Sequence, residues 1–302
     1  MLPAFGQSQG SKKQNNTKDD GAITATAKTI HVGVDIVLVN ATVTDPYNRL
    51  VTGLDKEDFQ VFEDGVPQEV AYYSSEDIPV SIGVIFDMSG SMSDKVNKAR
   101  QSAVQFFKTA NPQDEFFLVS FNEHAELTSR FTTSVEDLQS RLMYTAARGR
   151  TALLDGVYLG LSQMKGAHNS KKALLIISDG GDNHSRYSEK EVTNIVKESD
   201  VLIYSIGVFG GGGTAEEVGG PALLTKISEQ TGGRMFEANP VELPDMARKI
   251  GIELRNRYIL GYSPQNQARD GKYHRIVVKM VPPRGLPPLH AHWRLGYNAP
   301  ME

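Results

Sequence analysis

Between residues 79 and 257, short apolar runs alternate with segments of helical periodicity, and this alternation constrains the fold more than any other feature of the chain. The run Val80–Asp87 is almost wholly apolar, as expected for a strand covered on both faces. Residues 93–110 follow with apolar side chains at helical spacing. The alternation predicts the α/β class, with a doubly wound, mostly parallel sheet and helices on both faces.

The expected elements can be given as ranges. Strands are predicted at 80–87, 116–121, 127–133 (an antiparallel edge strand), 173–178, 201–208 and 234–237. Helices are predicted at 93–110, 134–144, from Thr151 onward, 188–198, 221–230 and 243–255.

Antiparallel β structure is expected on both sides of this region, in residues 29–79 and 257–302. In the first flank, Val32, Val34, Ile36 and Leu38 fall on one face of a strand and Val37 and Val39 on the other, which predicts partial burial on both sides. Glu63-Asp64-Gly65 predicts a hairpin with a return strand at 68–73. Later strands are expected at 258–262, 273–280 and 290–295.

The simplest domain organisation inserts an α/β domain, residues 80–256, into one β-sandwich built from 29–79 and 257–302. Two separate small β domains are the alternative, and each would be near the size at which a hydrophobic core becomes marginal. Residues 1–28 are polar and are expected to form a flexible tail.

Composition narrows the classes of function. The net charge of −4, with acids and bases nearly balanced, does not indicate a nucleic-acid-binding protein. The chain has no cysteine, which excludes disulfides and thiolate-ligated metals. No apolar run reaches the roughly 18–20 residues of a membrane span, and the apolar start is too short for a signal peptide.

Five oxygen-bearing residues sit where such a sheet binds ligands: Asp87, Ser89, Ser91, Thr151 and Asp179. The two aspartates end apolar strands, the serines lie on the turn after the first strand, and Thr151 opens a helix. Ligands of open α/β sheets bind outside the carboxyl ends of the strands, where the strand order reverses. Oxygen donors suit Mg²⁺, with Mn²⁺ or Ca²⁺ as alternatives. The alternative interpretation is that these residues only cap helices and turns.

Three segments resemble the von Willebrand factor A-like domain and its metal-ion-dependent adhesion site, over about residues 79–257. They are Asp87-x-Ser89-x-Ser91, Gly149-Arg150-Thr151-Ala152-Leu153 and Ser178-Asp179-Gly180-Gly181-Asp182-Asn183. The resemblance implies that Asp87, Ser89, Ser91, Thr151 and Asp179 are metal ligands. It also implies a protein-binding function in adhesion or scaffolding, in which an acidic side chain of a partner completes the coordination.

The sequence departs from this pattern at Arg150, where many members have a small residue. We expect Arg150, Asp182, Asn183 and His184 at the rim of the site, facing a partner. The flanks, around residues 51–65 and 258–262, resemble segments of bacterial and often exported proteins with such domains. This second resemblance favours a periplasmic or secreted location.

Two other functions remain open. A Mg²⁺-dependent hydrolase or phosphotransferase could use Asp87 as nucleophile, but the second carboxylate that such enzymes carry two residues later is Ser89 here, and no catalytic residue is predicted. A scaffold with a vestigial metal site is the other alternative.

Other polar features favour structural roles. The pair His290 and His292 is more typical of solvated strand positions than of a metal site, and Asp155 is expected to form hydrogen bonds behind the site. The glycine run at 210–213 predicts a loop, and the basic residues from Lys95 to Lys172 are interpreted as solvated helix faces.

Overall fold

A computed structural model describes residues 36–143, 146–209, 215–239 and 241–301. The expected tail at 1–28, Val32 and Val34, and the glycine run at 210–213 lie outside these residues. Within the described ranges, no helix combines the length and apolar character needed to cross a membrane.

The central sheet has six strands in the order β10-β9-β8-β5-β6-β7. Their bounds are β5 Val80–Asp87, β6 Glu115–Phe121, β7 Ala125–Thr132, β8 Lys171–Ser178, β9 Leu202–Gly207 and β10 Met235–Glu237. All neighbours pair in parallel except β7, which is antiparallel to β6. The chain continues from β5 to β6 on one side and later adds β8 on the other, so the strand order reverses between β5 and β8. The predicted fold class is confirmed.

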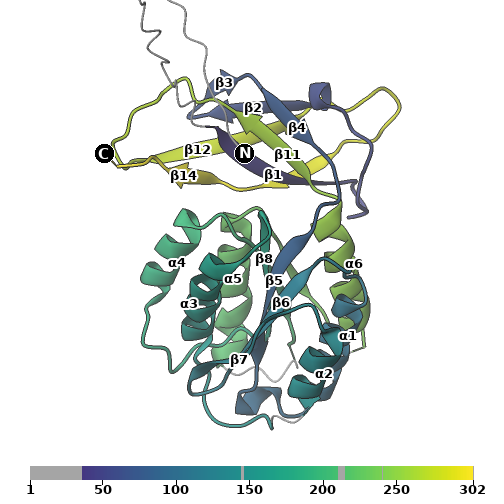
Figure 1. The fold of residues 1–302 in the computed structure, drawn as a ribbon, viewed down its shortest axis with the longest axis vertical. Helices are drawn as coiled ribbons and strands as arrows, with labels where there is room; N and C mark the ends of the chain where they lie inside the picture. The colour runs from purple at the N-terminus through teal and green to yellow at the C-terminus, as the bar shows by residue number, and fades with distance from the viewer. Residues whose placement is uncertain (1–35, 144–145, 210–214, 240, 302) are drawn as a thin grey trace, which may run out of the picture. The chain divides into compact units, whose positions relative to one another are not determined.

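Helices cover both faces of this sheet (Figure 1). One face packs against α1 Val96–Phe107, α2 Val135–Met143 and α6 Leu243–Arg255, and the other against α3 Leu153–Gln163, α4 Glu189–Glu198 and α5 Ala215–Gln230. In the part of the chain that the structure describes, short 3-10 turns also lie at Lys56–Asp58, Gly90–Met92 and Met164–Gly166. Every residue of β5 is buried, which explains why its sequence is almost continuously apolar.

The two flanks of the sequence pair with one another. One four-stranded sheet has the order β13-β1-β11-β4, and a second has the order β14-β12-β2-β3. The bounds are β1 Val37–Thr44, β2 Phe59–Glu63, β3 Val66–Gln68, β4 Tyr72–Ser74, β11 Tyr258–Tyr262, β12 Tyr273–Met280, β13 His290–Trp293 and β14 Gly296–Asn298. Val39 lies opposite Leu260 and Val61 opposite Val278, all in one buried cluster. Strands from before and after the α/β region therefore share one hydrophobic core.

Three local expectations were wrong. Ile36 and Leu38 are 52% and 51% exposed, because only the opposite face of β1 turns toward the sandwich core. The single return strand at 68–73 is divided into β3 and β4 in different sheets, with Val70 buried at the crossing. Helix α5 begins at Ala215 and carries Pro221 in its interior, whereas the sequence suggested that Pro221 would start it.

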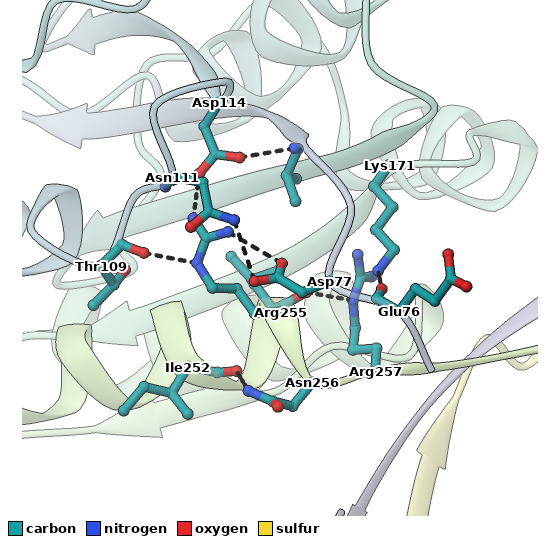
Figure 2. Close-up of polar contacts among 12 residues, drawn as sticks. Glu76, Asp77, Thr109, Asn111, Asp114, Lys171, Ile252, Arg255, Asn256 and Arg257 are labelled. Carbon is teal, nitrogen blue, oxygen red and sulfur yellow. Dashed lines mark hydrogen bonds and ion pairs between the residues drawn. The ribbon is translucent and has the colours of Figure 1, made fainter. Parts of the chain in front are cut away.

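The end of α6 is fixed to the segment that leads into β5 (Figure 2). Arg255 donates to the carbonyl of Thr109 at 2.6 Å, pairs with Asp77 at 3.3 Å and forms a close ion pair with the fully buried Asp114. The other oxygen of Asp114 accepts a hydrogen bond from the Val80 amide at 2.9 Å. One guanidinium thus connects α6, the loop between α1 and β6, and the start of β5.

Candidate functional site

The turn after β5 and the segment before α3 are joined by backbone hydrogen bonds. The carboxylate of Asp87 accepts from the amide of Ser89 at 2.8 Å, which folds the chain back at the end of the strand. The Gly90 amide donates to the Gly149 carbonyl at 3.0 Å, and the Arg148 amide to the Met88 carbonyl at 2.8 Å. These bonds place the residues that precede Thr151 against the turn that carries the two serines.

The segment after β8 closes on the same place. The amides of Asn183 and His184 donate to the carbonyl of Thr151 at 3.0 and 3.1 Å, while the Asn183 side chain accepts from the Thr151 amide at 3.0 Å. Gly180 makes this turn with a φ of +79°, and a Cβ there would lie 2.7 Å from the Gly220 backbone. A residue other than glycine would be strained at this position.

The structure thus brings together, at the edge where strand order reverses, the three segments that contain the predicted ligands. Asp87, Ser89, Thr151 and Asp179 are buried, and Ser91 is exposed at the mouth. The hydroxyls of Ser89 and Ser91 are 3.0 Å apart. The second oxygen of Asp87 accepts from the Ser178 hydroxyl at 2.6 Å, whereas Oδ2 of Asp179 is buried without a hydrogen-bond partner among the described residues.

Two carboxylates, those of Asp87 and Asp179, lie at this buried edge, and their proximity affects the pKa of Asp87. Burial, reinforced by the negative charge of Asp179, raises the pKa of Asp87 to about 7 from an ordinary value of 3.8. Hydrogen bonds from Ser178 and Ser89 oppose the rise without cancelling it. The site therefore favours positive charge.

Metal-free protein should lose stability as the pH rises, because the folded chain holds the Asp87 proton more tightly than the unfolded chain. This contribution is complete below about pH 4 and is lost as the pH rises through 7, by at most about 4 kcal/mol. Asp87→Asn mimics the protonated form. In chelator, the variant should match wild type near pH 4 and exceed it by a few kcal/mol above pH 7 in urea unfolding. A difference independent of pH would contradict this assignment.

Lys95 is a residue of this site that sequence reasoning missed. Its side chain is buried rather than solvated, and Nζ lies 3.7 Å from Oδ2 of Asp179. It stands immediately before α1, in the loop that follows the two serines, and not on the outer face of that helix. Nothing local in the sequence distinguishes it from a solvated lysine near the start of a helix. The ammonium places one positive charge beside the Asp179 carboxylate.

The donor set fits a hard divalent cation. Carboxylate and hydroxyl oxygens converge on one buried edge, and a buried carboxylate oxygen without a hydrogen-bond partner is costly unless something pairs with it. Asp155 lies behind the site and is 4% exposed, and its carboxylate accepts from the amides of Arg186 and Tyr187. Its hydrogen bonds hold the loop after β8.

Of the four predicted rim residues, three are exposed: Arg150, Asn183 and His184. Nη1 of Arg150 lies 3.5 Å from Nδ1 of His184. Asp182 is half-buried, and its oxygens accept from the Leu154 amide at 2.8 Å and from Ser185. The Asp182 carboxylate therefore holds the first turn of α3, and the exposed rim consists of the other three side chains.

Residues 82–181 match the family profile described as the von Willebrand factor type A domain. The match includes the first two motif segments, the beginning of the third, and the chain from within β5 to the end of β8. The chain carries a von Willebrand factor type A domain. Its sheet order and its two helical layers are those expected for this fold.

Known proteins resemble this chain in sequence and in fold. An uncharacterized protein of Borreliella burgdorferi is 26% identical over 202 residues, which are 57% of this chain and 59% of that protein. Inter alpha-trypsin inhibitor heavy chain 4 of Mus musculus is 26% identical over 214 residues, 64% of this chain and 22% of the mouse protein. This chain thus spans less than two thirds of either relative.

A solved structure, a von Willebrand factor type A protein from Catenulispora acidiphila, aligns with a TM-score of 0.52 and 13% identity. The alignment covers 88% of this chain and 74% of that one, so the likeness extends beyond the A domain. At this level of identity it supports the fold alone.

Outside the A domain, the histidine pair of β13 gathers no third ligand among the described residues. His290 is exposed, as expected for a solvated strand position, but His292 is half-buried, so that interpretation was wrong for His292. Burial lowers the pKa of His292 to about 4. A different group, Glu63, Asp64 and His274, places three ligand atoms within 4.8 Å of one another. His274 Nδ1 already lies 2.8 Å from Asp64, so this cluster is internally paired.

Proposed function

We propose that this protein is a divalent-metal-dependent protein-binding module that acts in adhesion or as a scaffold. Asp87, Ser89, Ser91, Thr151 and Asp179 would hold the cation, with Mg²⁺ as the expected ion and Mn²⁺ or Ca²⁺ as alternatives. The observation that carries the proposal is the buried Oδ2 of Asp179, which lies beside Asp87 at the switch point of the sheet and has no hydrogen-bond partner among the described residues, only the Lys95 ammonium at 3.7 Å.

An acidic side chain of a partner protein is the proposed ligand. A cation held here would offer an open coordination position to a carboxylate oxygen. The exposed rim supports the same choice, because Arg150 and His184 flank the mouth and a guanidinium there favours a negatively charged group. The rim and the cation would then select the same chemistry in a partner.

A binding role is also favoured over catalysis. Asp87, the only nucleophile suggested by the motif, is fully buried, and its two oxygens accept hydrogen bonds from Ser89 and Ser178. Such a carboxylate has no exposed surface from which to attack a substrate. As part of the proposal, we place the protein outside the cytoplasm, periplasmic or secreted, on the likeness of its flanks to exported proteins.

Capture of acidic peptides tests the proposal. Immobilised wild type, probed with a displayed peptide library in Mg²⁺, should enrich sequences that carry Asp or Glu, and chelator should release them. Asp87→Ala should reduce capture at least tenfold, because the first carboxylate of the site is gone. Arg130→Gln changes an exposed charge on β7 and should capture like wild type. Capture that persists in chelator or in Asp87→Ala would overturn the proposal.

A further inference from the structure

A second site lies at the opposite edge of the central sheet. Lys171 is the first residue of β8, whereas Asp87 is the last residue of the neighbouring strand β5. Lys171 lines a cavity of about 590 Å³, within the size range of small-molecule sites. Residues from β1, β11 and the chain end after β14 line the same cavity.

Arg257, in the short connection from α6 to β11, is a cation of this cavity whose charge is not balanced. The side chain is 1% exposed, and Nε donates to the carbonyl of Leu254 at 3.1 Å. Among the described residues, the buried Nη1 has no hydrogen-bond partner and no carboxylate lies within ion-pair distance of the guanidinium. A buried guanidinium in this condition destabilises the folded state.

Lys171 places a second cation beside the first. Figure 2 shows the ammonium of Lys171 close to the guanidinium of Arg257. Lys171 is 5% exposed and donates to the carbonyl of Glu76 at 2.6 Å, a neutral acceptor. The interpretation of Lys171 as part of a solvated helix face was therefore wrong. Burial, followed by the positive charge of Arg257, lowers the pKa of Lys171 to about 8.

The nearby acids do not neutralise this pair. The Glu76 carboxylate points away from both cations in Figure 2, and that side chain is exposed. The Asp77 carboxylate is held by Arg255 at 3.3 Å and by the Asn111 amide group at 3.2 Å. Among the described residues, no carboxylate forms an ion pair with Lys171 or Arg257; Glu198 and Asp200 also line the cavity but are exposed, and Asp200 pairs with Arg294.

We propose that this cavity binds a small organic anion whose carboxylate or phosphate group is held by Arg257 and Lys171. A guanidinium and an ammonium are the usual partners of such groups, and Nη1 of Arg257 is a donor that no described residue satisfies. Leu38, Ile259 and Ala299 give part of the remaining wall an apolar surface that suits an uncharged body, whereas Glu198 and Asp200 add acidic groups and Lys172, Arg269 and Arg294 add basic groups elsewhere on the lining. The site uses none of the residues of the metal site.

Thermal unfolding of the whole chain at constant ionic strength tests the proposal with three probes. Benzoate offers a carboxylate on an apolar body, inorganic phosphate offers the other anionic group, and benzamide is the uncharged counterpart of benzoate. The melting temperature should rise and saturate with benzoate or phosphate, and the two arms show which group is preferred. Benzamide should have no effect. Absence of a rise with either anion would overturn the proposal.

Arg257→Met is the decisive variant, because it keeps the length of the side chain and removes the charge. The response to the effective anion should require at least tenfold more ligand, whereas Arg130→Gln should respond like wild type. Without ligand, Arg257→Met should melt at the same temperature as wild type or higher, because it removes an uncompensated buried charge. If that variant does not fold, Lys171→Met takes its place with the same expected loss. An undiminished response in a folded variant would overturn the assignment.

Discussion

Replacing Arg255 with methionine should lower the free energy of unfolding by roughly 3 kcal/mol, measured by urea denaturation. The guanidinium is the main partner of Asp114, a carboxylate with no exposed side-chain surface, and it also bonds the Thr109 carbonyl. Methionine preserves most of the apolar stem but leaves the Asp114 charge buried with amide donors alone. The loss should appear in the midpoint of unfolding, with an unchanged dependence on denaturant.

The same helix offers a matched control. Arg248 pairs with Asp245 at 3.3 Å, but both side chains are mostly exposed. Solvent screens such pairs, so Arg248→Met should change the free energy of unfolding by less than about 0.5 kcal/mol. Equal losses in the two variants, or a negligible loss for Arg255→Met, would mean that the contacts in Figure 2 do not anchor α6.

Asp179→Ala should abolish the stabilisation that divalent cations give to wild type. For a cation at a hundredfold excess over its Kd, linkage predicts a gain of about 2.7 kcal/mol, seen as a melting temperature that rises and saturates with Mg²⁺. The Asp179 side chain contributes the buried oxygen that lacks a hydrogen-bond partner among the described residues, so the melting temperature of the variant should not rise with Mg²⁺.

Asp94→Ala is the control for this experiment, because Asp94 is an exposed acid in the same loop as Lys95. It should retain the full response to Mg²⁺. A saturable rise in Asp179→Ala equal to that of wild type would show that the cation acts elsewhere on the chain.

Much of the α/β fold could be predicted because its signals are local. The eight-residue run of β5 is apolar since both of its faces are covered, and α6 has the predicted bounds, Leu243–Arg255. The β strands that flank this region were harder to predict. Leu38 was assigned to a partly buried face, but which face of β1 turns inward depends on its pairing with β11 and β13, from the other end of the chain. Local alternation does not contain that information.

The proposed metal site and the proposed anion site also differ in how far the sequence predicts them. The oxygen residues follow strands and turns in a fixed order, so sequence position alone indicated which edge of the sheet would carry them. The burial of Lys95, Lys171 and Arg257 had no such signal. Long cationic side chains are usually solvated, and only the tertiary arrangement reveals that these three face carboxylates or a cavity.

The most direct test of the metal-dependent binding module is to count the ions that the protein holds. Equilibrium dialysis against Mg²⁺, followed by metal analysis, should find a single saturable ion for each wild-type chain. Asp87→Ala should hold none under the same conditions, while remaining folded by circular dichroism. Absence of saturable binding to wild type, or equal binding to Asp87→Ala, would contradict the account.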